Sequence, residues 1–153
     1  MKPLSPASIL VVDDDVDHAY IARIVLQSIV PAVPIEVRHA AANAFDALLD
    51  LPRGSLVLID RVLDDAESFD TIVRMRAERP DVAIVLLSAA LSSVDRAYAI
   101  ACGAFEAIEK PSGLDGWRRA LGALLSATTP PDPPTAPACA GTMTGVRACS
   151  SAA

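Results

Sequence analysis

Three short runs of apolar residues constrain the fold of this chain more strongly than any other feature of its sequence. Residues 9–12, 56–59 and 83–87 are apolar at every position, and uninterrupted runs of this length are typical of strands covered on both faces. Two further segments, residues 35–38 and 105–109, mix polar and apolar side chains, as strands at the edge of a sheet do. The pattern predicts a parallel sheet with three buried central strands and two edge strands.

Helix-like periodicity fills the segments between and after these strands. Apolar residues recur three and four positions apart in five segments, which cover residues 18–29, 43–51, 69–80, 92–103 and 117–125. Strands that alternate with helices make right-handed crossovers, which gives an α/β fold with a doubly wound parallel sheet and the strand order 2-1-3-4-5. Such sheets bind ligands beyond the carboxyl ends of the strands, at the switch point between the first and third strands.

Length and composition bound the organisation of the chain. Its 153 residues fit one globular domain, which we expect to cover residues 1–127. Residues 128–153 are rich in Pro, Thr and Ala and are predicted to be a disordered tail, because they have too little apolar surface to offset the entropy of ordering.

Charge and cysteine content exclude several classes of function. A formal net charge of −6 argues against nucleic acid or an anionic membrane surface as a partner, since both attract basic faces. No stretch of the sequence approaches the roughly 18 apolar residues that a membrane span requires. The three cysteines form no CxxC pair, so the sequence shows neither a zinc site nor a secreted disulfide framework. We therefore expect a cytoplasmic protein.

Acidic residues end two of the predicted central strands. Asp13, Asp14 and Asp15 follow the first apolar run, and Asp60 follows the second, so the sheet brings these carboxylates to its switch point. Clustered carboxylates stay ionised together at neutral pH only when a cation compensates them. A small, open set of hard oxygen ligands suits Mg²⁺, which retains several of its waters and shares its shell with phosphate.

A hydroxyl and an ammonium group end the other two strands on this side of the sheet. Ser88 follows residues 83–87, and Lys110 follows residues 105–109. Facing metal-loaded carboxylates, these groups form a site for a phosphoryl group. The hydroxyl can donate a hydrogen bond to a phosphoryl oxygen, while the metal and the lysine neutralise the negative charge.

These strand ends and their spacing resemble the receiver domain of bacterial two-component response regulators. Asp60 and Ser88 lie 28 positions apart, and Ser88 and Lys110 lie 22 apart, both usual spacings in receivers. The resemblance covers residues 8 to about 127 and implies a flavodoxin-like (βα)5 fold. Its motifs are Ile9-Leu10-Val11-Val12-Asp13-Asp14-Asp15, Leu56-Val57-Leu58-Ile59-Asp60, Val85-Leu86-Leu87-Ser88-Ala89, Gly103-Ala104 and Lys110-Pro111.

The resemblance implies that Asp60 is the phosphoacceptor. In this family the corresponding aspartate takes a phosphoryl group from a phosphohistidine on a sensor histidine kinase or a histidine phosphotransfer protein. The family also implies Mg²⁺ as the cofactor. Asp14 would be a direct ligand, Asp13 would act mainly through water, and Asp60 and the backbone carbonyl of Val62 would complete the protein ligands.

Ser88 and Lys110 take the phosphoryl-binding and switch roles that the resemblance implies. Ser88 would close on the phosphoryl oxygens, and Lys110 would pair with them. The family further implies that the bond between Lys110 and Pro111 is cis, which an X-Pro bond allows at low cost. Val62 and Ala90, two residues past Asp60 and Ser88, cannot position an attacking water, so we expect slow self-dephosphorylation.

Three positions depart from the family pattern. Asp64 and Ser68 stand where receivers usually carry Pro and Gly, so we expect the loop after the third strand to differ in shape and to carry extra negative charge. Ala107 stands where an aromatic switch residue normally lies. The usual coupling of a shift at Ser88 to a ring on the fifth strand is therefore missing, which concerns the output route more than the phosphorylation chemistry.

Together these features predict a stand-alone receiver that is phosphorylated on Asp60 and signals through phosphorylation-dependent protein contacts. It would not be an enzyme in the usual sense, since it would catalyse only its own phosphorylation and dephosphorylation. The alternative is a pseudo-receiver that acts as an interaction module without phosphorylation. A haloacid-dehalogenase-like phosphatase is disfavoured, because its Asp-x-Asp motif needs Thr or Val where this chain has Asp17. His18 and His39 are interpreted as surface residues, since no second metal ligand is spaced with them.

Overall fold

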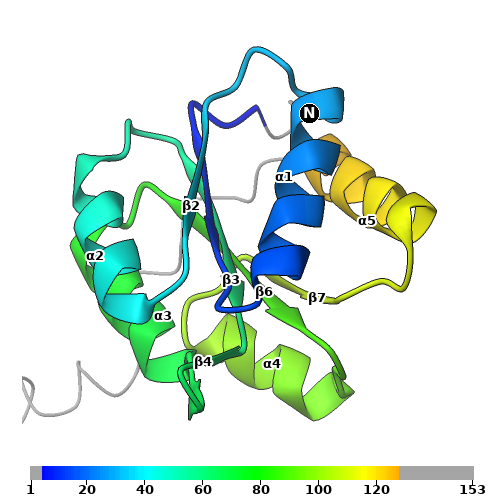
Figure 1. Ribbon diagram of the computed structural model, residues 1–153. Coiled ribbons are helices and arrows are strands. Elements are labelled where there is room, and N and C mark those ends of the chain that lie inside the picture. Colours follow the sequence, from blue (N-terminus) through cyan, green and yellow to red (C-terminus); the bar gives the residue numbers. More distant parts are fainter. Residues whose placement is uncertain (1–4, 128–153) are drawn as a thin grey trace, which may run out of the picture.

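Five parallel strands form the central sheet in the computed structural model, which describes residues 5–127 (Figure 1). The strand order is β2-β1-β3-β6-β7, and the predicted order 2-1-3-4-5 is confirmed, because β6 and β7 are the fourth and fifth strands of this sheet. The predicted tail, residues 128–153, lies outside the described residues. The strands are β1 (Ile9–Val12), β2 (Ile35–Arg38), β3 (Leu56–Asp60), β6 (Ala83–Ser88) and β7 (Glu106–Glu109).

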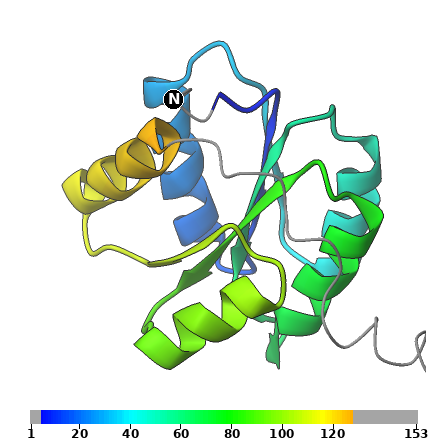
Figure 2. The same cartoon turned by 180° about the vertical axis from the view of Figure 1, so that it is seen from behind.

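Helices cover both faces of the sheet, which makes the doubly wound α/β architecture that the sequence predicts (Figures 1 and 2). One face packs against α1 and α5, and the other against α2, α3 and α4. None of the helices in the described part of the chain is long and apolar enough to cross a bilayer. The helices are α1 (Val16–Ile29), α2 (Ala41–Asp50), α3 (Phe69–Glu78), α4 (Ser93–Ala101) and α5 (Leu114–Ser126).

The central strands are apolar up to their carboxyl ends because each face of the sheet is buried. In β1, Ile9 and Val11 pack with the core under α1 and α5, whereas Leu10 and Val12 pack under α2 and α3. Successive strand residues point to opposite faces, so both sets must be apolar. The edge strand β2 is only half-buried along its length, which explains its mixed sequence.

A small hairpin that the sequence does not indicate follows β3. Its strands, β4 (Val62–Leu63) and β5 (Ala66–Glu67), pair antiparallel through the turn residues Asp64 and Asp65. Both turn residues have positive φ angles, 51° and 63°, a conformation that two-residue hairpin turns require and that Asp tolerates better than most residues. The loop after β3 is therefore a hairpin whose turn carries two additional carboxylates.

Candidate functional site

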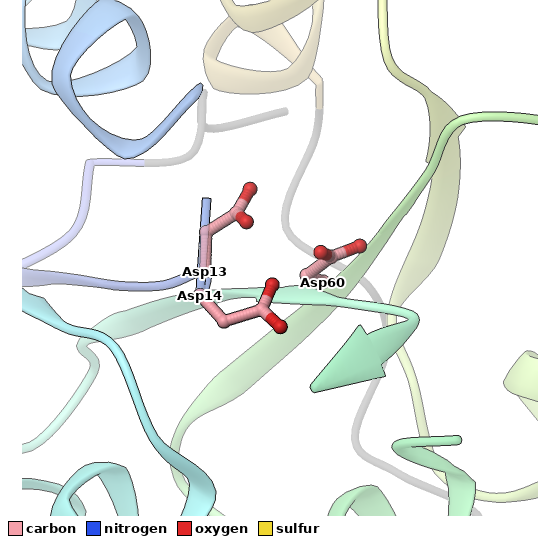
Figure 3. Close-up of side chains that lie close together, drawn as sticks. All are labelled: Asp13, Asp14 and Asp60. Atoms are coloured by element: carbon pink, nitrogen blue, oxygen red, sulfur yellow. The ribbon is translucent and has the colours of Figure 1, made fainter. Parts of the chain in front are cut away.

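The three predicted acidic residues come together at the carboxyl ends of β1 and β3 (Figure 3). Asp13 and Asp14 follow β1 directly, and Asp60 is the last residue of β3. One carboxylate oxygen from each lies within 4.8 Å of the others. Asp13 and Asp60 are buried and Asp14 is exposed, so the cluster is open to water on the side of Asp14. This is the switch point of the sheet, where the fold class places its ligands.

Lys110 supplies the positive charge at this cluster. Its Nζ lies 2.7 Å from Oδ2 of Asp13 and 3.2 Å from Oδ2 of Asp60. The lysine side chain is only 7% exposed, and a cation so placed needs ionised partners. A third group, Nδ1 of His18, lies 3.3 Å from the same Nζ. The strand ends predicted that Lys110 would face the acidic cluster, but nothing in the sequence indicated its contact with His18.

Burial and crowding raise the pKa of Asp60 above its ordinary value. The larger cause is the loss of hydration of this carboxylate, and the second is repulsion from the charge of Asp13. Attraction to Lys110 opposes the shift without cancelling it. Three carboxylates against one ammonium leave the cluster with excess negative charge, and a divalent cation would compensate it.

The donor set fits a hard divalent cation. The carboxylate of Asp13 accepts a hydrogen bond from the N–H of Asp15 at 2.9 Å, and that of Asp14 accepts one from the N–H of Asp64 at 3.2 Å. These bonds orient the carboxylates while leaving lone pairs for a metal. Oxygen ligands with one open side are the arrangement in which Mg²⁺ keeps several waters. The role of the Val62 carbonyl as a further ligand stays a prediction.

Ser88 lies at the end of β6 with its hydroxyl turned into its own loop. The hydroxyl donates a hydrogen bond of 2.6 Å to the carbonyl of Ala90, and the residue is buried. To bind a phosphoryl group on Asp60, this hydroxyl must leave the Ala90 carbonyl. Ala107 is buried too, so the position of the usual aromatic holds a small core residue, as the sequence indicates.

One predicted feature of the site is wrong. The peptide bond between Lys110 and Pro111 is trans, and residues 5–127 contain no cis peptide bond. The trans form is the more stable one for an X-Pro bond by about 0.5–1 kcal/mol. It also lets the Lys110 ammonium reach Asp13 and Asp60, so the ion pairs of the site do not require the cis form.

The hairpin after β3 is tied to that strand by two side chains, of which the sequence singled out Ser68 but not Arg61. Ser68 donates its hydroxyl to the carbonyl of Asp60 at 2.5 Å and its N–H to that of Arg61 at 2.7 Å. The guanidinium of Arg61 pairs with Glu67 of the hairpin at 3.0 Å and with Asp95 in the first turn of α4 at 2.9 Å. No local pattern marks Arg61, because its partners meet it only in the folded chain.

The two histidines differ in their relation to the site. His39 is exposed and its Nδ1 lies 2.9 Å from the backbone carbonyl of Asp13. His18 keeps 41% of its side chain exposed and contacts both Lys110 and Asp15. The interpretation as surface residues holds for exposure, but it misses that both rings border the acidic cluster.

Known proteins match this chain along its described length. A family model described as the response regulator receiver domain matches residues 9–121. The DNA-binding transcriptional regulator NtrC of Azospirillum brasilense is 33% identical over 130 residues, which is 84% of this chain and 26% of that relative. The chain therefore spans about a quarter of the length of the curated relative.

Solved structures of response regulators are also similar to this chain. NtrX from Brucella abortus is 27% identical with a TM-score of 0.66, and the match covers 79% of this chain and 27% of that one. A CheY-like response regulator receiver domain protein from Methanospirillum hungatei JF-1 is 20% identical with a TM-score of 0.65, over 79% of this chain and 94% of the other. The second likeness shows the shared fold alone.

Proposed function

The chain belongs to the response regulator receiver domain family, and from this premise we propose that it accepts a phosphoryl group on Asp60 from a phosphohistidine. Receiver domains are signalling phosphoacceptors rather than conventional enzymes. The observation that carries the proposal is the meeting of Asp60 with Asp13, Asp14 and Lys110 at the switch point of the sheet. A buried carboxylate flanked by a metal-binding pair and an ammonium group is equipped for phosphoryl transfer.

In the proposed reaction, an ionised oxygen of Asp60 attacks the phosphorus atom of the phosphohistidine. A P–O bond forms and the P–N bond breaks, and its electron pair stays on the imidazole nitrogen, which takes up a proton. Lys110 pairs with the phosphoryl oxygens, and Ser88 turns its hydroxyl from Ala90 toward them. Mg²⁺ held by Asp13, Asp14 and Asp60, with the carbonyl of Val62, would neutralise charge on the transferring group.

The phosphodonor that we propose is a sensor histidine kinase or a histidine phosphotransfer protein in the cytoplasm. The output is a phosphorylation-dependent contact with another protein. Phosphorylation adds about −1.5 to −2 charges at the strand ends, beside the Arg61 side chain that links the acceptor strand to α4. Direct nucleic-acid contact by the receiver itself is not part of the proposal, because the net charge is −6.

A pseudo-receiver remains the second candidate. Two observations favour it, namely the small buried residue Ala107 in place of the aromatic and the engagement of the Ser88 hydroxyl by Ala90. In that case the fold would present a constant surface to a partner. The intact carboxylate cluster and its lysine favour the phosphoacceptor.

Intact mass separates the two candidates. The protein is incubated with acetyl phosphate and Mg²⁺, and a mass increase of one phosphoryl group is expected. Asp60→Asn and chelation by EDTA should each abolish it, whereas Asp46→Asn, a matched change of an exposed aspartate on α2, should leave it intact. No increase in a chain that remains folded by circular dichroism would favour the pseudo-receiver.

A further inference from the structure

We propose that His18 is a positioning residue that orients the ammonium group of Lys110 in the phosphoryl-transfer site. The inference rests on the proposed function and adds a residue from α1 to it. It is carried by the contact between Nδ1 of His18 and Nζ of Lys110, which are 3.3 Å apart although 92 positions separate the two residues in the sequence.

The first step is the hydrogen-bonding capacity of the lysine. An ammonium group has three N–H donors and no acceptor. The described structure gives Nζ of Lys110 three partners, which are Oδ2 of Asp13 at 2.7 Å, Oδ2 of Asp60 at 3.2 Å and Nδ1 of His18 at 3.3 Å. The lysine side chain is 7% exposed, so little water can replace a lost partner. Asp13 accepts a hydrogen bond from this ammonium group and Asp60 forms an ion pair with it, and His18 offers an acceptor for a second N–H.

The second step is the protonation state that this contact requires. Because the ammonium group only donates, Nδ1 of His18 must accept, and the ring proton must lie on Nε2. A protonated imidazole would instead repel Lys110 and pair with Asp15, whose Oδ2 lies 3.4 Å from the same Nδ1. The neutral Nε2–H tautomer is therefore the form that orients the lysine.

The start of α1 fixes the backbone of His18 at the site. Asp15 is the N-cap of this helix, and its Oδ1 accepts hydrogen bonds from the N–H groups of Asp17 at 3.0 Å and His18 at 3.1 Å. Capping bonds of this kind hold the first turn in place. The Asp15 side chain thus places His18 beside Lys110 by anchoring the turn that carries it.

The third step concerns the reaction. In the proposed site a metal ion would bind Asp13 and Asp60, and the phosphoryl group would be bonded to Asp60; these aspartates are the other two partners of Lys110. The contact with His18 involves neither of these groups, so it can hold the ammonium in position while its other partners change. Misplacing a charged group by about an ångström can slow a reaction strongly. Loss of the imidazole should therefore lower the rate of phosphorylation without disturbing the fold.

The kinetic test compares two substitutions at one position. His18→Leu removes the acceptor, and we expect the maximal rate of phosphorylation by acetyl phosphate to fall about tenfold, the size expected for one lost hydrogen bond to a charged group. The half-saturating concentration should change by less than about twofold, since the effect is on the transfer step. His18→Asn, whose Oδ1 can stand where Nδ1 stood, should restore most of the rate.

Controls and contrary outcomes follow from the same design. Asp17→Asn changes a charge in the same helical turn without touching Lys110 and should match the wild type. Urea unfolding should show that both His18 variants are folded. Equal rates for wild type and His18→Leu would overturn the inference, and so would equally slow His18→Leu and His18→Asn variants.

A second measurement does not depend on phosphorylation. The chain has two histidines, so imidazole ¹⁵N spectra can be assigned with one His18 and one His39 variant. We expect the Nε2–H tautomer at His18 in the wild type and its loss in Lys110→Met. If the imidazole ¹⁵N signals of His18 are the same in Lys110→Met as in the wild type, the inference is overturned. If the wild-type protein gains no phosphoryl mass, the proposed function is overturned instead.

Discussion

The two ends of the central sheet treat an aspartate in opposite ways. Asp81, just before β6 at the amino end, is held by Arg79 through bonds of 3.0 Å and 2.9 Å, and this pairing lowers its pKa to about 2. Asp60, at the carboxyl end, has a raised pKa because burial and the charge of Asp13 outweigh the attraction of Lys110. The ionised form of Asp81 is therefore stabilised by the fold, whereas the ionised form of Asp60 is destabilised by it.

The contrast extends to the surrounding contacts. Arg79 also donates a hydrogen bond of 2.8 Å to the carbonyl of Leu48, near the end of α2. One guanidinium therefore connects the end of α2, the end of α3 and the segment that leads into β6. At the carboxyl end, neighbouring carboxylates repel each other, and Asp64 and Asp65 hold positive φ angles. The excess negative charge and the strained backbone of the turn both reduce the stability of the free protein.

The largest effect on folding should come from removing the guanidinium at the amino end. Arg79→Leu breaks its ion pair with Asp81 and its bonds to backbone carbonyls of the α2 end. We expect the free energy of unfolding to fall by about 3 kcal/mol, because a carboxylate and buried acceptors lose a charged partner. Urea unfolding measures this, and phosphorylation of the folded fraction should be unchanged.

Arg118→Leu is the matched control for that experiment. Arg118 is 55% exposed and its ion pair with Asp115 spans 3.8 Å, so its loss should change stability by less than about 0.5 kcal/mol. If both variants lose the same stability, the guanidinium of Arg79 does not act as the link between α2, α3 and β6.

The sheet with its acidic cluster and the contacts around them differ in how far the sequence predicts them. The central strands and the acidic cluster were predictable, because burial on both faces leaves continuous apolar runs and the cluster sits where those runs end. The contacts of Arg79, Arg61 and His18 were not, since each joins segments that meet only after folding. The hairpin after β3 was missed because its strands have two residues each and its turn lacks glycine.

Acid should weaken the ion pair between Arg79 and Asp81 at the amino end of the sheet. The pKa of Asp81 lies at about 2, below its ordinary value of 3.8, so its pairing stabilises the fold fully above pH 3.8 and less as the pH falls toward 2. The contribution lost is up to about 2 kcal/mol. Unfolding free energies of wild type and Asp81→Asn should therefore converge across this window, and parallel curves would contradict the ion pair.

Mg²⁺ should offset the repulsion among the carboxylates at the carboxyl end of the sheet. A cation that binds only the folded protein stabilises it, by about 1.4 kcal/mol at a concentration ten times its dissociation constant. Thermal unfolding with and without Mg²⁺ measures this, and Asp14→Asn should remove most of the gain. The same gain in Asp14→Asn would mean that the ion acts elsewhere on the protein.

Neutralising Asp60 should stabilise the fold even though it abolishes phosphorylation. At pH 7 the unfolded chain ionises this carboxyl more readily than the folded one, so its raised pKa counts against folding. We expect Asp60→Asn to raise the free energy of unfolding by about 1 kcal/mol. The gain should shrink as the pH falls below the raised pKa, where the native carboxyl is protonated. A loss of stability at pH 7 would show that the pairing with Lys110 outweighs burial.

The smallest expected effect lies in the turn of the β4–β5 hairpin. Asp65 has a φ of 63°, which costs energy for any residue with a Cβ, and glycine relieves that cost while losing more chain entropy. We expect Asp65→Gly to stabilise the fold by about 0.5 kcal/mol. Asp65→Asn removes the same charge but keeps the Cβ. If both variants stabilise equally, the cost at this end of the sheet is electrostatic, and if only glycine does, it is backbone strain.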